Sequence, residues 1–389
     1  MNSIPLSVPN LNGKELEYVT ECIKTGWISS AGKFVERFEI DTAKYTGAGY
    51  AVAAVNGTCA LFIALKEMGI GPGDEVIVPA LTFIAPVNAV HYTGAAPVFM
   101  DCDDLFCMDM KKLSSFFNEE TEMRNNRCFN RNTGKPVKAV IPVHVFGNAC
   151  DLETLTDLCA GKNILILEDA TESLGTRYTQ GKFAGKSPGC IGKAGVLSFN
   201  GNKIITAGGG GMILTDDKKL AERLKYLTTQ AKEPGPEYIH HEAGYNFRLT
   251  NLAAALGAAQ LEQLDEFILH KKNNYLLYQK LLSEIPGCTL CPVNSNASVN
   301  YWFYALKLEK SFGMDAMELV RFLQERQIES RPIWRLNHLQ KPYLEAQSYM
   351  IEKAPVLQKA IVNLPCSSNL SEKEVERVCA CIKEAGKIS

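Results

Sequence analysis

The sequence predicts an α/β fold with a mostly parallel sheet, followed by a smaller α+β domain. From about residue 45 to 215, short β-branched runs alternate with amphipathic helical stretches, which is typical of a parallel sheet covered on both faces. Beyond about residue 270 the chain shows polar, proline-containing loops instead. A chain of 389 residues is also long for one hydrophobic core. We therefore expect a large domain over residues 1–250 and a small domain over residues 251–389.

Seven short apolar runs in the first domain are the candidate strands, and small or polar residues follow each of them. In order along the chain they are residues 51–55, 75–78, 97–100, 138–143, 164–168, 196–199 and 211–215. Helical spacing over residues 60–68 predicts a helix directly after the first strand. Open α/β sheets bind ligands beyond the carboxyl ends of their strands, so we expect the residues after these runs to meet in one crevice.

The second domain is expected to contain few elements. Apolar residues at helical spacing over residues 252–269 predict one long helix that leaves the large domain. Proline-containing loops then lead to a candidate strand at 301–308, a helix at 315–326 and a closing helix at 372–385.

Composition and charge exclude several classes of protein. The formal net charge is −2, so no basic surplus is present to neutralise a nucleic-acid backbone. No apolar run reaches 18 residues and no signal-like segment opens the chain, so we expect a cytoplasmic protein without membrane contact. The 13 cysteines are then expected to remain thiols. Cys288 and Cys291 have a metal-like spacing, but no second pair completes four ligands, so no metal is expected.

Asp169 and Lys203 suggest the chemistry. Asp169 ends an otherwise apolar run, where a carboxylate is costly unless a cation pairs with it. Lys203 lies on a loop of small residues ahead of four glycines. Pyridoxal phosphate needs this combination, because it forms a Schiff base with a lysine and carries a protonated ring nitrogen at its other edge. A helix N-cap or a salt bridge for Asp169 and a surface position for Lys203 are the structural alternatives.

Three further residues suit the same cofactor. Gly57 and Thr58 lie between a strand and a helix, where backbone N–H groups and the helix dipole would hold a phosphate. Phe83 can lie flat on an aromatic ring. Taken alone, each has a simpler interpretation: a turn glycine, an N-cap threonine and a core phenylalanine. Their order and spacing together favour the cofactor site.

Seven motifs in this order resemble the DegT/DnrJ/EryC1/StrS family of sugar aminotransferases, which belongs to the fold-type I pyridoxal phosphate enzymes. The resemblance runs almost from end to end and implies an aspartate aminotransferase-like fold with a seven-stranded sheet. The motifs are Gly26-Trp27-Ile28-Ser29-Ser30, Asn56-Gly57-Thr58, Thr82-Phe83-Ile84-Ala85, Glu168-Asp169-Ala170, Ser198-Phe199-Asn200-Gly201-Asn202-Lys203, Gly244-Tyr245-Asn246-Phe247-Arg248 and Glu329-Ser330-Arg331-Pro332-Ile333-Trp334.

The resemblance implies roles around the cofactor ring. Lys203 would carry the cofactor and shuttle protons, Asp169 would pair with the pyridine nitrogen, and Phe83 would stack on the ring. Glu172 stands where most relatives have glutamine or histidine. A glutamate there would contact the phenolic oxygen of the cofactor only if the two groups share a proton.

The resemblance also implies how the phosphate is held and how the chain assembles. Gly57, Thr58 and Ser198 would form the phosphate cradle. Asn246 resembles an asparagine that the neighbouring subunit lends to the phosphate. A homodimer with shared active sites is therefore expected.

Candidates for the substrate pocket are less specific. Arg331 is expected to hold the phosphates of a nucleotide sugar, because a guanidinium makes paired bonds to phosphate oxygens, and a surface ion pair is its structural alternative. Trp27, Ser29, His144 and His338 are weaker candidates for the sugar pocket, since a histidine at a strand end is often only a hydrogen-bonded part of the fold.

Gly209 guides the choice of substrate. Many relatives have a glutamate at this position, and the glutamate-free run resembles members that aminate UDP-linked 2-acetamido-4-keto-6-deoxy sugars. We therefore expect L-glutamate to aminate the C4 ketone of UDP-2-acetamido-2,6-dideoxy-4-hexulose, for a surface glycan or a nonulosonic acid. The alternative is a perosamine-forming enzyme, which acts on GDP-4-keto-6-deoxymannose and usually keeps that glutamate.

Three other functions fit the sequence less well. A sugar dehydratase of the same fold would have histidine in place of Lys203. A non-catalytic or regulatory protein of this fold would not need both Lys203 and Asp169. A nicotinamide enzyme is excluded because no G-x-G-x-x-G follows the first strand.

Overall fold

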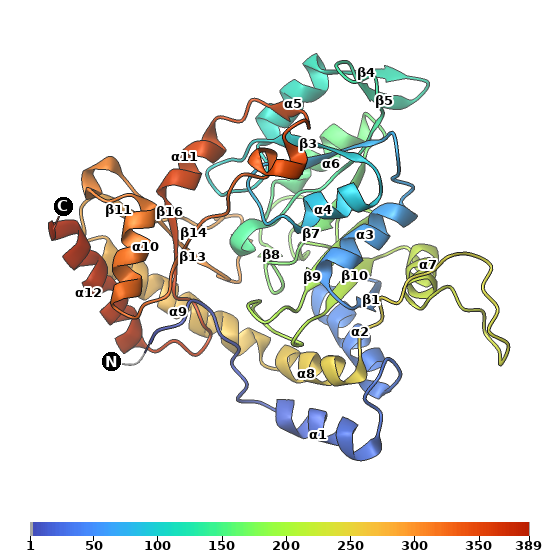
Figure 1. Cartoon of the computed structure of the whole chain (residues 1–389), viewed down its shortest axis with the longest axis horizontal. Helices are drawn as coiled ribbons and strands as arrows, with labels where there is room; N and C mark the ends of the chain where they lie inside the picture. The colour runs from blue at the N-terminus through green and yellow to red at the C-terminus, as the bar shows by residue number, and fades with distance from the viewer. Residues whose placement is uncertain (1–2, 389) are drawn as a thin grey trace.

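A computed structural model describes residues 3–388, and its largest element is an eight-stranded sheet in the order β1-β10-β9-β7-β6-β2-β3-β15 (Figure 1). The pairings from β9 to β15 are parallel, whereas β1 and β10 join antiparallel. This sheet confirms the predicted α/β class. The strands are β1 Tyr50–Ala54, β2 Glu75–Pro79, β3 Ala96–Met100, β6 Val137–Val140, β7 Leu165–Asp169, β9 Ala194–Ser198, β10 Gly211–Thr215 and β15 Ser348–Tyr349.

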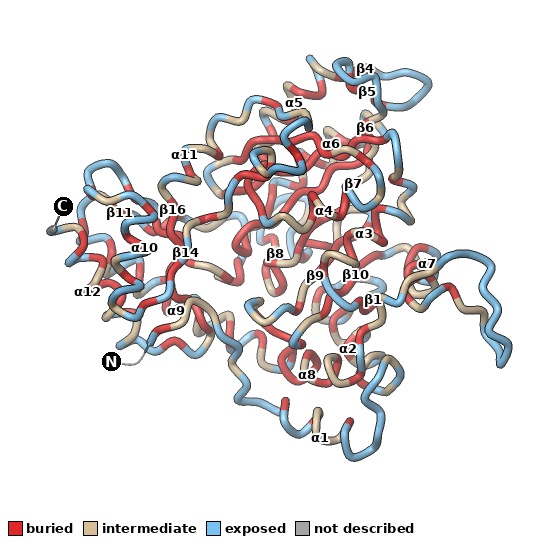
Figure 2. Tube along the Cα trace, viewed as in Figure 1, coloured by how far each residue is buried: buried red, intermediate tan, exposed pale blue. Residues whose placement is uncertain are grey.

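Helices cover both faces of this sheet, so its strands are buried on each side (Figure 2). In β10, Ile213 packs into one core, whereas Met212 and Leu214 pack into the other, as the alternation of side chains along a strand requires. The helices of the large domain are α1 Glu15–Thr25, α2 Lys33–Thr46, α3 Gly57–Glu67, α4 Ala85–Tyr92, α5 Met110–Glu119, α6 Leu152–Ala160, α7 Lys218–Thr228 and α8 Asn251–Leu261.

The small domain is a four-stranded sheet, β11-β13-β16-β14, packed against helices. All its pairings are antiparallel, and both chain ends lie beside it in Figure 1. Its elements are α9 Leu264–Leu282, β11 Cys288–Leu290, β13 Tyr304–Leu308, α10 Ala316–Glu325, β14 Arg331–Pro332, α11 Lys353–Ala360, β16 Ile361–Leu364 and α12 Glu372–Ile388.

The structure differs from the predicted elements in three places. The sheet has eight strands rather than seven, because the two-residue β15 joins it from far along the chain. The helix predicted over 252–269 is two helices, α8 and α9, so that α8 packs on α1 and α2 while α9 enters the small domain. Two further pairs of short strands were not predicted, because they show no clear alternation of apolar and polar residues. They are β4 Thr121–Arg124 with β5 Arg127–Asn130, and β8 Arg177–Tyr178 with β12 Ala297–Ser298.

Three segments cross the boundary expected at 250/251, which itself stays a prediction. Helix α8 follows that boundary but packs on α1 and α2 of the large domain. Ile4 packs in the core of the small domain, and β15 pairs with β3 of the large sheet. The two domains are therefore connected by several segments of the chain and not by one helix alone.

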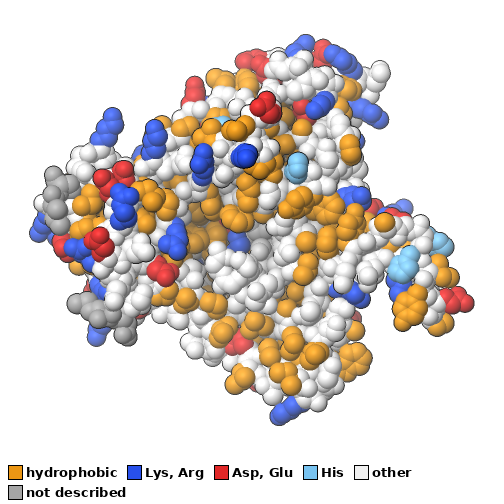
Figure 3. Space-filling view, in the orientation of Figure 1, with side chains coloured by type: hydrophobic (Ala, Val, Ile, Leu, Met, Phe, Trp, Pro, Cys, Tyr) orange, Lys and Arg blue, Asp and Glu red, His pale blue; other side chains and the backbone are white. Residues whose placement is uncertain are grey.

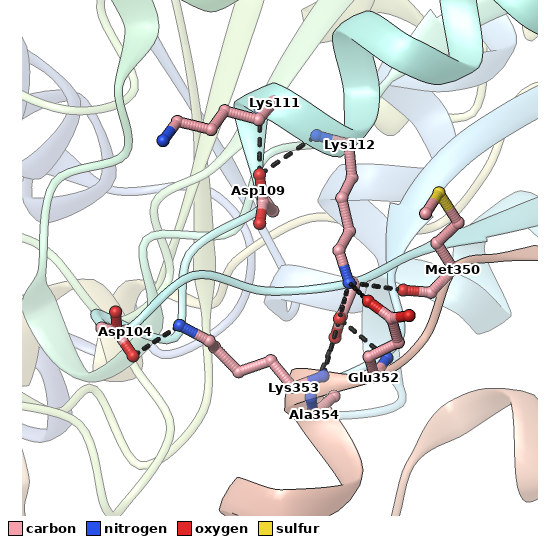
Figure 4. A network of polar contacts seen from close by, with 9 residues as sticks. Asp104, Asp109, Lys111, Lys112, Met350, Glu352, Lys353 and Ala354 are labelled. Carbon is pink, nitrogen blue, oxygen red and sulfur yellow. Dashed lines mark hydrogen bonds and ion pairs between the residues drawn. The ribbon is translucent and has the colours of Figure 1, made fainter.

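Asp101 directly follows β3 and anchors the segment after β15. Its partners Lys112, Glu352, Lys353 and Ala354 are labelled in Figure 4. Its buried carboxylate accepts the backbone N–H groups of Glu352, Lys353 and Ala354 at 2.9, 2.8 and 2.9 Å and the Nζ of Lys112 at 2.7 Å. Burial opposes this charge, but Lys112 and the three N–H groups hold the pKa of Asp101 below its ordinary value. The carboxylate thus fixes the start of α11 to the large domain.

No helix within residues 3–388 is both long and apolar enough to cross a bilayer.

Candidate active site

A cavity of about 700 Å³ lies between the two domains, where the surface is hollowed in Figure 3. Residues that follow β1, β2, β7 and β9 line one side of it, and β14, β16 and the loop before β13 line the other. The residues after these large-domain strands therefore meet in one crevice, as the sheet topology predicts.

Lys203 lies in this cavity with a largely buried amine. Its Nζ is 3.7 Å from Oε1 of Glu172 and 4.1 Å from the centroid of the Trp302 ring. Burial lowers the pKa of Lys203, against the opposing charges of Glu172 and Asp169. A lysine with a lowered pKa is a better nucleophile toward an aldehyde at neutral pH.

Glu172 is only 3% exposed. Its Oε2 accepts the backbone N–H of Phe146 at 2.8 Å, and its Oε1 faces Lys203. Burial raises the pKa of Glu172 to about 7, although the Lys203 charge lowers it. Near neutral pH this carboxyl group can hold a proton, and a glutamate here needs one to contact the phenolic oxygen of the cofactor.

Asp169 ends β7 and is 2% exposed. Its Oδ1 accepts the backbone N–H of Thr171 at 3.1 Å. Burial raises the pKa of Asp169, while the nearby Lys203 charge lowers it. Asp169 is not among the residues that line the cavity, whereas Thr171, two residues later in the chain, does line it. A cationic ring nitrogen at this place would stabilise the buried carboxylate.

The start of α3 supplies a cradle for a phosphate. Asn56 caps this helix by accepting the N–H of Cys59 at 2.8 Å, and the first helical N–H groups have no acceptor within the helix. A Cβ on Gly57 would lie 3.2 Å from Cβ of Ser198 and 3.4 Å from Cγ2 of Thr171. Ser198 and Thr171 therefore approach Gly57 too closely for an unstrained side chain at that position. Gly57, Thr58 and Ser198 all line the cavity, and the backbone N–H groups at the start of α3 suit an anion held by these three residues.

Phe83, Gly209 and Arg331 also line the cavity. Phe83 is 53% exposed, so it is not a core residue and is free to stack on a ligand. No atom lies within 4 Å of where a Cβ of Gly209 would be, so this glycine leaves open space. Arg331 makes no ion pair within the described residues and donates only to the backbone oxygen of Ser330, at 3.2 Å. The core and ion-pair alternatives therefore do not hold for Phe83 and Arg331.

The structure does not bring His144 into the cavity, which corrects its assignment to the sugar pocket. The ring is fully buried, its Nδ1 accepts the N–H of Cys150 at 3.1 Å, and its Nε2 lies 3.1 Å from Oε2 of Glu168. Glu168 also accepts three backbone N–H groups, from Gly189, Ile191 and Gly192. Both residues are hydrogen-bonded parts of the fold beside the end of β7.

Trp27, Ser29, His338 and Asn246 also lie outside the lining of this cavity. Trp27 and Ser29 are exposed on the loop after α1, and His338 packs against Phe99. Asn246 is exposed and its Oδ1 accepts Nε of Arg248 at 3.0 Å. An asparagine that serves a neighbouring subunit would lie outside its own cavity, so the role of Asn246 stays a prediction.

Sequence reasoning missed Trp302, Thr171 and Asn363, which line the cavity. Trp302 donates its indole N–H to the backbone oxygen of Asn202 at 2.8 Å and so supports the Lys203 loop. Trp302 and Asn363 come from the small domain, and sequence order gives no sign that they face Lys203. Thr171 was within reach, because it lies two residues after Asp169.

The model of the DegT/DnrJ/EryC1/StrS aminotransferase family matches residues 9–383. The chain belongs to this aminotransferase family. It is 37% identical to GDP-perosamine synthase from Caulobacter vibrioides over 98% of both chains, and 36% identical to GDP-perosamine synthase from Escherichia coli O157:H7 over 99% of both. Among solved structures, the aminotransferase TlmJ from Streptoalloteichus hindustanus superposes with a TM-score of 0.88, at 26% identity over 99% of both chains.

The enzyme is accordingly a pyridoxal phosphate-dependent sugar aminotransferase. The residues present fit that cofactor: the lysine amine, the glycine and threonine at the start of α3 and an exposed aromatic ring line one cavity. The buried carboxylate of Asp169 lies near enough to Lys203 for the lysine charge to lower its pKa. No group of three or more metal-binding side chains occurs within residues 3–388.

Proposed function

We propose that the enzyme moves the amino group of L-glutamate to the C4 ketone of a GDP-linked 4-keto-6-deoxy sugar, with GDP-4-keto-6-deoxymannose as the substrate. Three GDP-perosamine synthases are 34–37% identical to it along nearly the whole chain. An aminotransferase named for a UDP-linked sugar is 28% identical. Similarity over the whole chain outweighs the single Gly209 departure, so the GDP-linked alternative replaces the UDP-linked expectation.

The meeting of Lys203 and Glu172 in one cavity, with the buried Asp169 carboxylate close enough to feel the lysine charge, carries this proposal. Pyridoxal phosphate, when bound, supplies the electron sink that lets an amino group leave one carbon and join another. Lys203, whose amine is freed when the amino acid binds, would take the proton from Cα of the donor and deliver it to the cofactor. In the second half of the cycle it would move a proton at C4 of the sugar in the opposite direction.

Glu172 would hold a proton beside this lysine. Its carboxyl group, with a pKa of about 7, can give a hydrogen bond in its neutral form and accept one in its charged form. Trp302 and Phe83 would limit water around the reacting atoms, since both line the same cavity.

Arg331 and the second subunit complete the proposed site. Arg331 would hold the diphosphate of the nucleotide sugar, and Asn246 of each subunit would serve the phosphate of the cofactor in the other. Large apolar side chains exposed on α1, among them Leu16 at 81% and Ile23 at 64%, support a homodimer. Hydrophobic side chains also gather on that part of the surface in Figure 3.

A turnover panel tests the substrate. The purified enzyme with L-glutamate would be given 4-keto-6-deoxy sugars linked to GDP, UDP and dTDP, and we expect the highest kcat/KM with the GDP compound. Faster turnover of the UDP-linked 2-acetamido sugar would instead favour the space left by Gly209 as the deciding feature. Turnover of none of these sugars would overturn the proposed function.

A further inference from the structure

Asn363 has a side-chain oxygen that no described protein group satisfies. It lies in β16, is 6% exposed and lines the main cavity. Its Oδ1 is buried and has no hydrogen-bond partner among the described residues. A buried oxygen left unpaired destabilises a protein, so its presence needs an explanation.

The position of Asn363 separates it from other unpaired groups. Four more residues within 3–388 carry a buried side-chain atom without a partner, namely Asn10, Thr42, Ser330 and His338. None of these four lines the main cavity. Asn363 is therefore the one residue among these five that both carries an unpaired buried oxygen and lines the cavity.

The neighbour of Asn363 limits what the amide can bind. Arg331 is its directly opposed partner in the antiparallel pair of β14 and β16. Side chains opposed in this way have Cβ atoms about 4.5–5.5 Å apart, so one ligand can reach both groups. A guanidinium takes an anion, and the group next to that anion on the same ligand would face the amide.

The chemistry of an amide favours neighbouring hydroxyl groups. An asparagine side chain offers one acceptor and one donor side by side, so it is fully satisfied by a ligand that also has both. Carboxylate and phosphate oxygens only accept at neutral pH and would leave Oδ1 unpaired. Oδ1 is covered in this structure, and a turn about the broad terminal torsion of asparagine would present it to the cavity.

We propose that Asn363 binds adjacent ring hydroxyl groups of the nucleotide-linked sugar and so determines specificity for a sugar hydroxylated at C2 and C3. This inference rests on the proposed function. To the proposed function the inference adds one residue that distinguishes a 2-hydroxy sugar from a 2-acetamido sugar. In the amino-acid half of the cycle no such hydroxyl pair is present, so Asn363 would contribute little there.

The two half-reactions can be measured separately on the holoenzyme. The visible absorbance of the bound cofactor follows the reaction with L-glutamate alone, and the aminated enzyme is then mixed with the GDP-linked sugar. For Asn363→Leu we expect kcat/KM of the sugar half-reaction to fall at least about tenfold, with the glutamate half-reaction within about twofold of wild type. Asn363→Ala is a second variant, in case the leucine side chain disturbs β16. It should likewise impair the sugar half-reaction and spare the glutamate half-reaction.

Stability provides a readout that a structural role would not give. Leucine removes the unpaired buried oxygen, so Asn363→Leu should keep or raise the melting temperature while it impairs sugar turnover. The matched control is Thr42→Val, which removes another unpaired buried atom, in α2 and away from the cavity. That variant should change neither half-reaction.

A substrate analogue completes the test. The GDP-linked sugar without its 2-hydroxyl should react more slowly with wild type, and Asn363→Leu should show no further loss with it. An unchanged sugar half-reaction in both Asn363 variants, or equal losses in the two half-reactions, would overturn the inference. Failure of the wild-type enzyme on every nucleotide sugar would instead contradict the proposed function.

Discussion

Burial sets the chemistry of the residues around Lys203. The lysine pKa is lowered and the Glu172 pKa is raised to about 7 by the same loss of solvent, although the two groups attract each other at 3.7 Å. Both shifts favour the neutral forms and so bring the two pKa values closer together, which makes it easier for a proton to pass between the groups. In an exposed ion pair of the same residue types, both groups would stay charged at neutral pH, so no proton would pass between them.

Glu172→Gln should change how stability depends on pH. The folded pKa of Glu172 is above its ordinary value of 4.5, so its stabilising contribution is complete below pH 4.5 and is lost as the pH rises through about 7. Glutamine does not titrate. Relative to wild type, the cofactor-free variant should therefore gain up to about 1–3 kcal/mol of unfolding free energy between pH 5 and pH 8, by urea denaturation. An offset that does not vary with pH would contradict a raised pKa.

Gly57→Ala should weaken cofactor binding. The added Cβ would lie 3.2 Å from Cβ of Ser198, so two residues of the proposed phosphate cradle would have to move apart. We expect the dissociation constant of pyridoxal phosphate to rise about tenfold or more, measured by absorbance titration. Gly71→Ala is the control, because a Cβ there meets no atom within 4 Å and the residue is outside the cavity. Equal affinity of the two variants would exclude Gly57 from the cradle.

At this scale the sequence indicates which large-domain residues line the site but not which small-domain residues face them. Gly57, Thr58, Phe83, Ser198 and Lys203 follow strand ends, which topology brings together. Trp302 and Asn363 reach the cavity only through domain packing, which no local pattern encodes. His144 was misassigned because a histidine at a strand end is equally compatible with a buried hydrogen-bond network.

Among the elements, α11 depends on one carboxylate at the end of β3. Asp101 accepts three N–H groups at the start of this helix, and α11 leads directly into β16, which carries Asn363. The anchor thus links the large sheet to the opposite wall of the cavity. The sequence shows Asp101 only as one of several polar residues at strand ends.

Asp101→Ala should destabilise the enzyme substantially. It leaves Lys112 without its buried partner and three N–H groups without their acceptor, so we expect a loss of about 3–5 kcal/mol in urea denaturation. Asp104→Ala is the matched control: this carboxylate also binds a lysine, Lys353, but is exposed, and its loss should cost less than about 1 kcal/mol. Similar losses in both variants would mean that Asp101 is not a special anchor.

The pattern of apolar residues predicts the long elements well and the short ones poorly. All seven predicted strands occur in the sheet, because buried parallel strands have continuous apolar runs. The two-residue β15 has too few residues to show a period. The division between α8 and α9 follows from their packing against different domains, which an uninterrupted apolar spacing does not reveal.

For the whole molecule, the exposed position of Asn246 and the apolar surface of α1 predict an assembly with shared sites. Lys203→Ala and Asn246→Asp should each be nearly inactive, the second because a carboxylate would repel the cofactor phosphate. After subunits of the two variants are exchanged in equal amounts, each mixed dimer would contain one intact site. Activity should then recover to about a quarter of wild type. Activity no greater than that of the separate variants would contradict shared sites.

Reduction of the purified holoenzyme with borohydride, followed by mass spectrometry of its peptides, shows which residue carries the cofactor. The position of Lys203 in the cavity, beside Glu172 and coupled to Asp169, predicts a pyridoxyl phosphate group on Lys203. Attachment to any other lysine, or no attachment in an enzyme that is active, would contradict the assignment of this site.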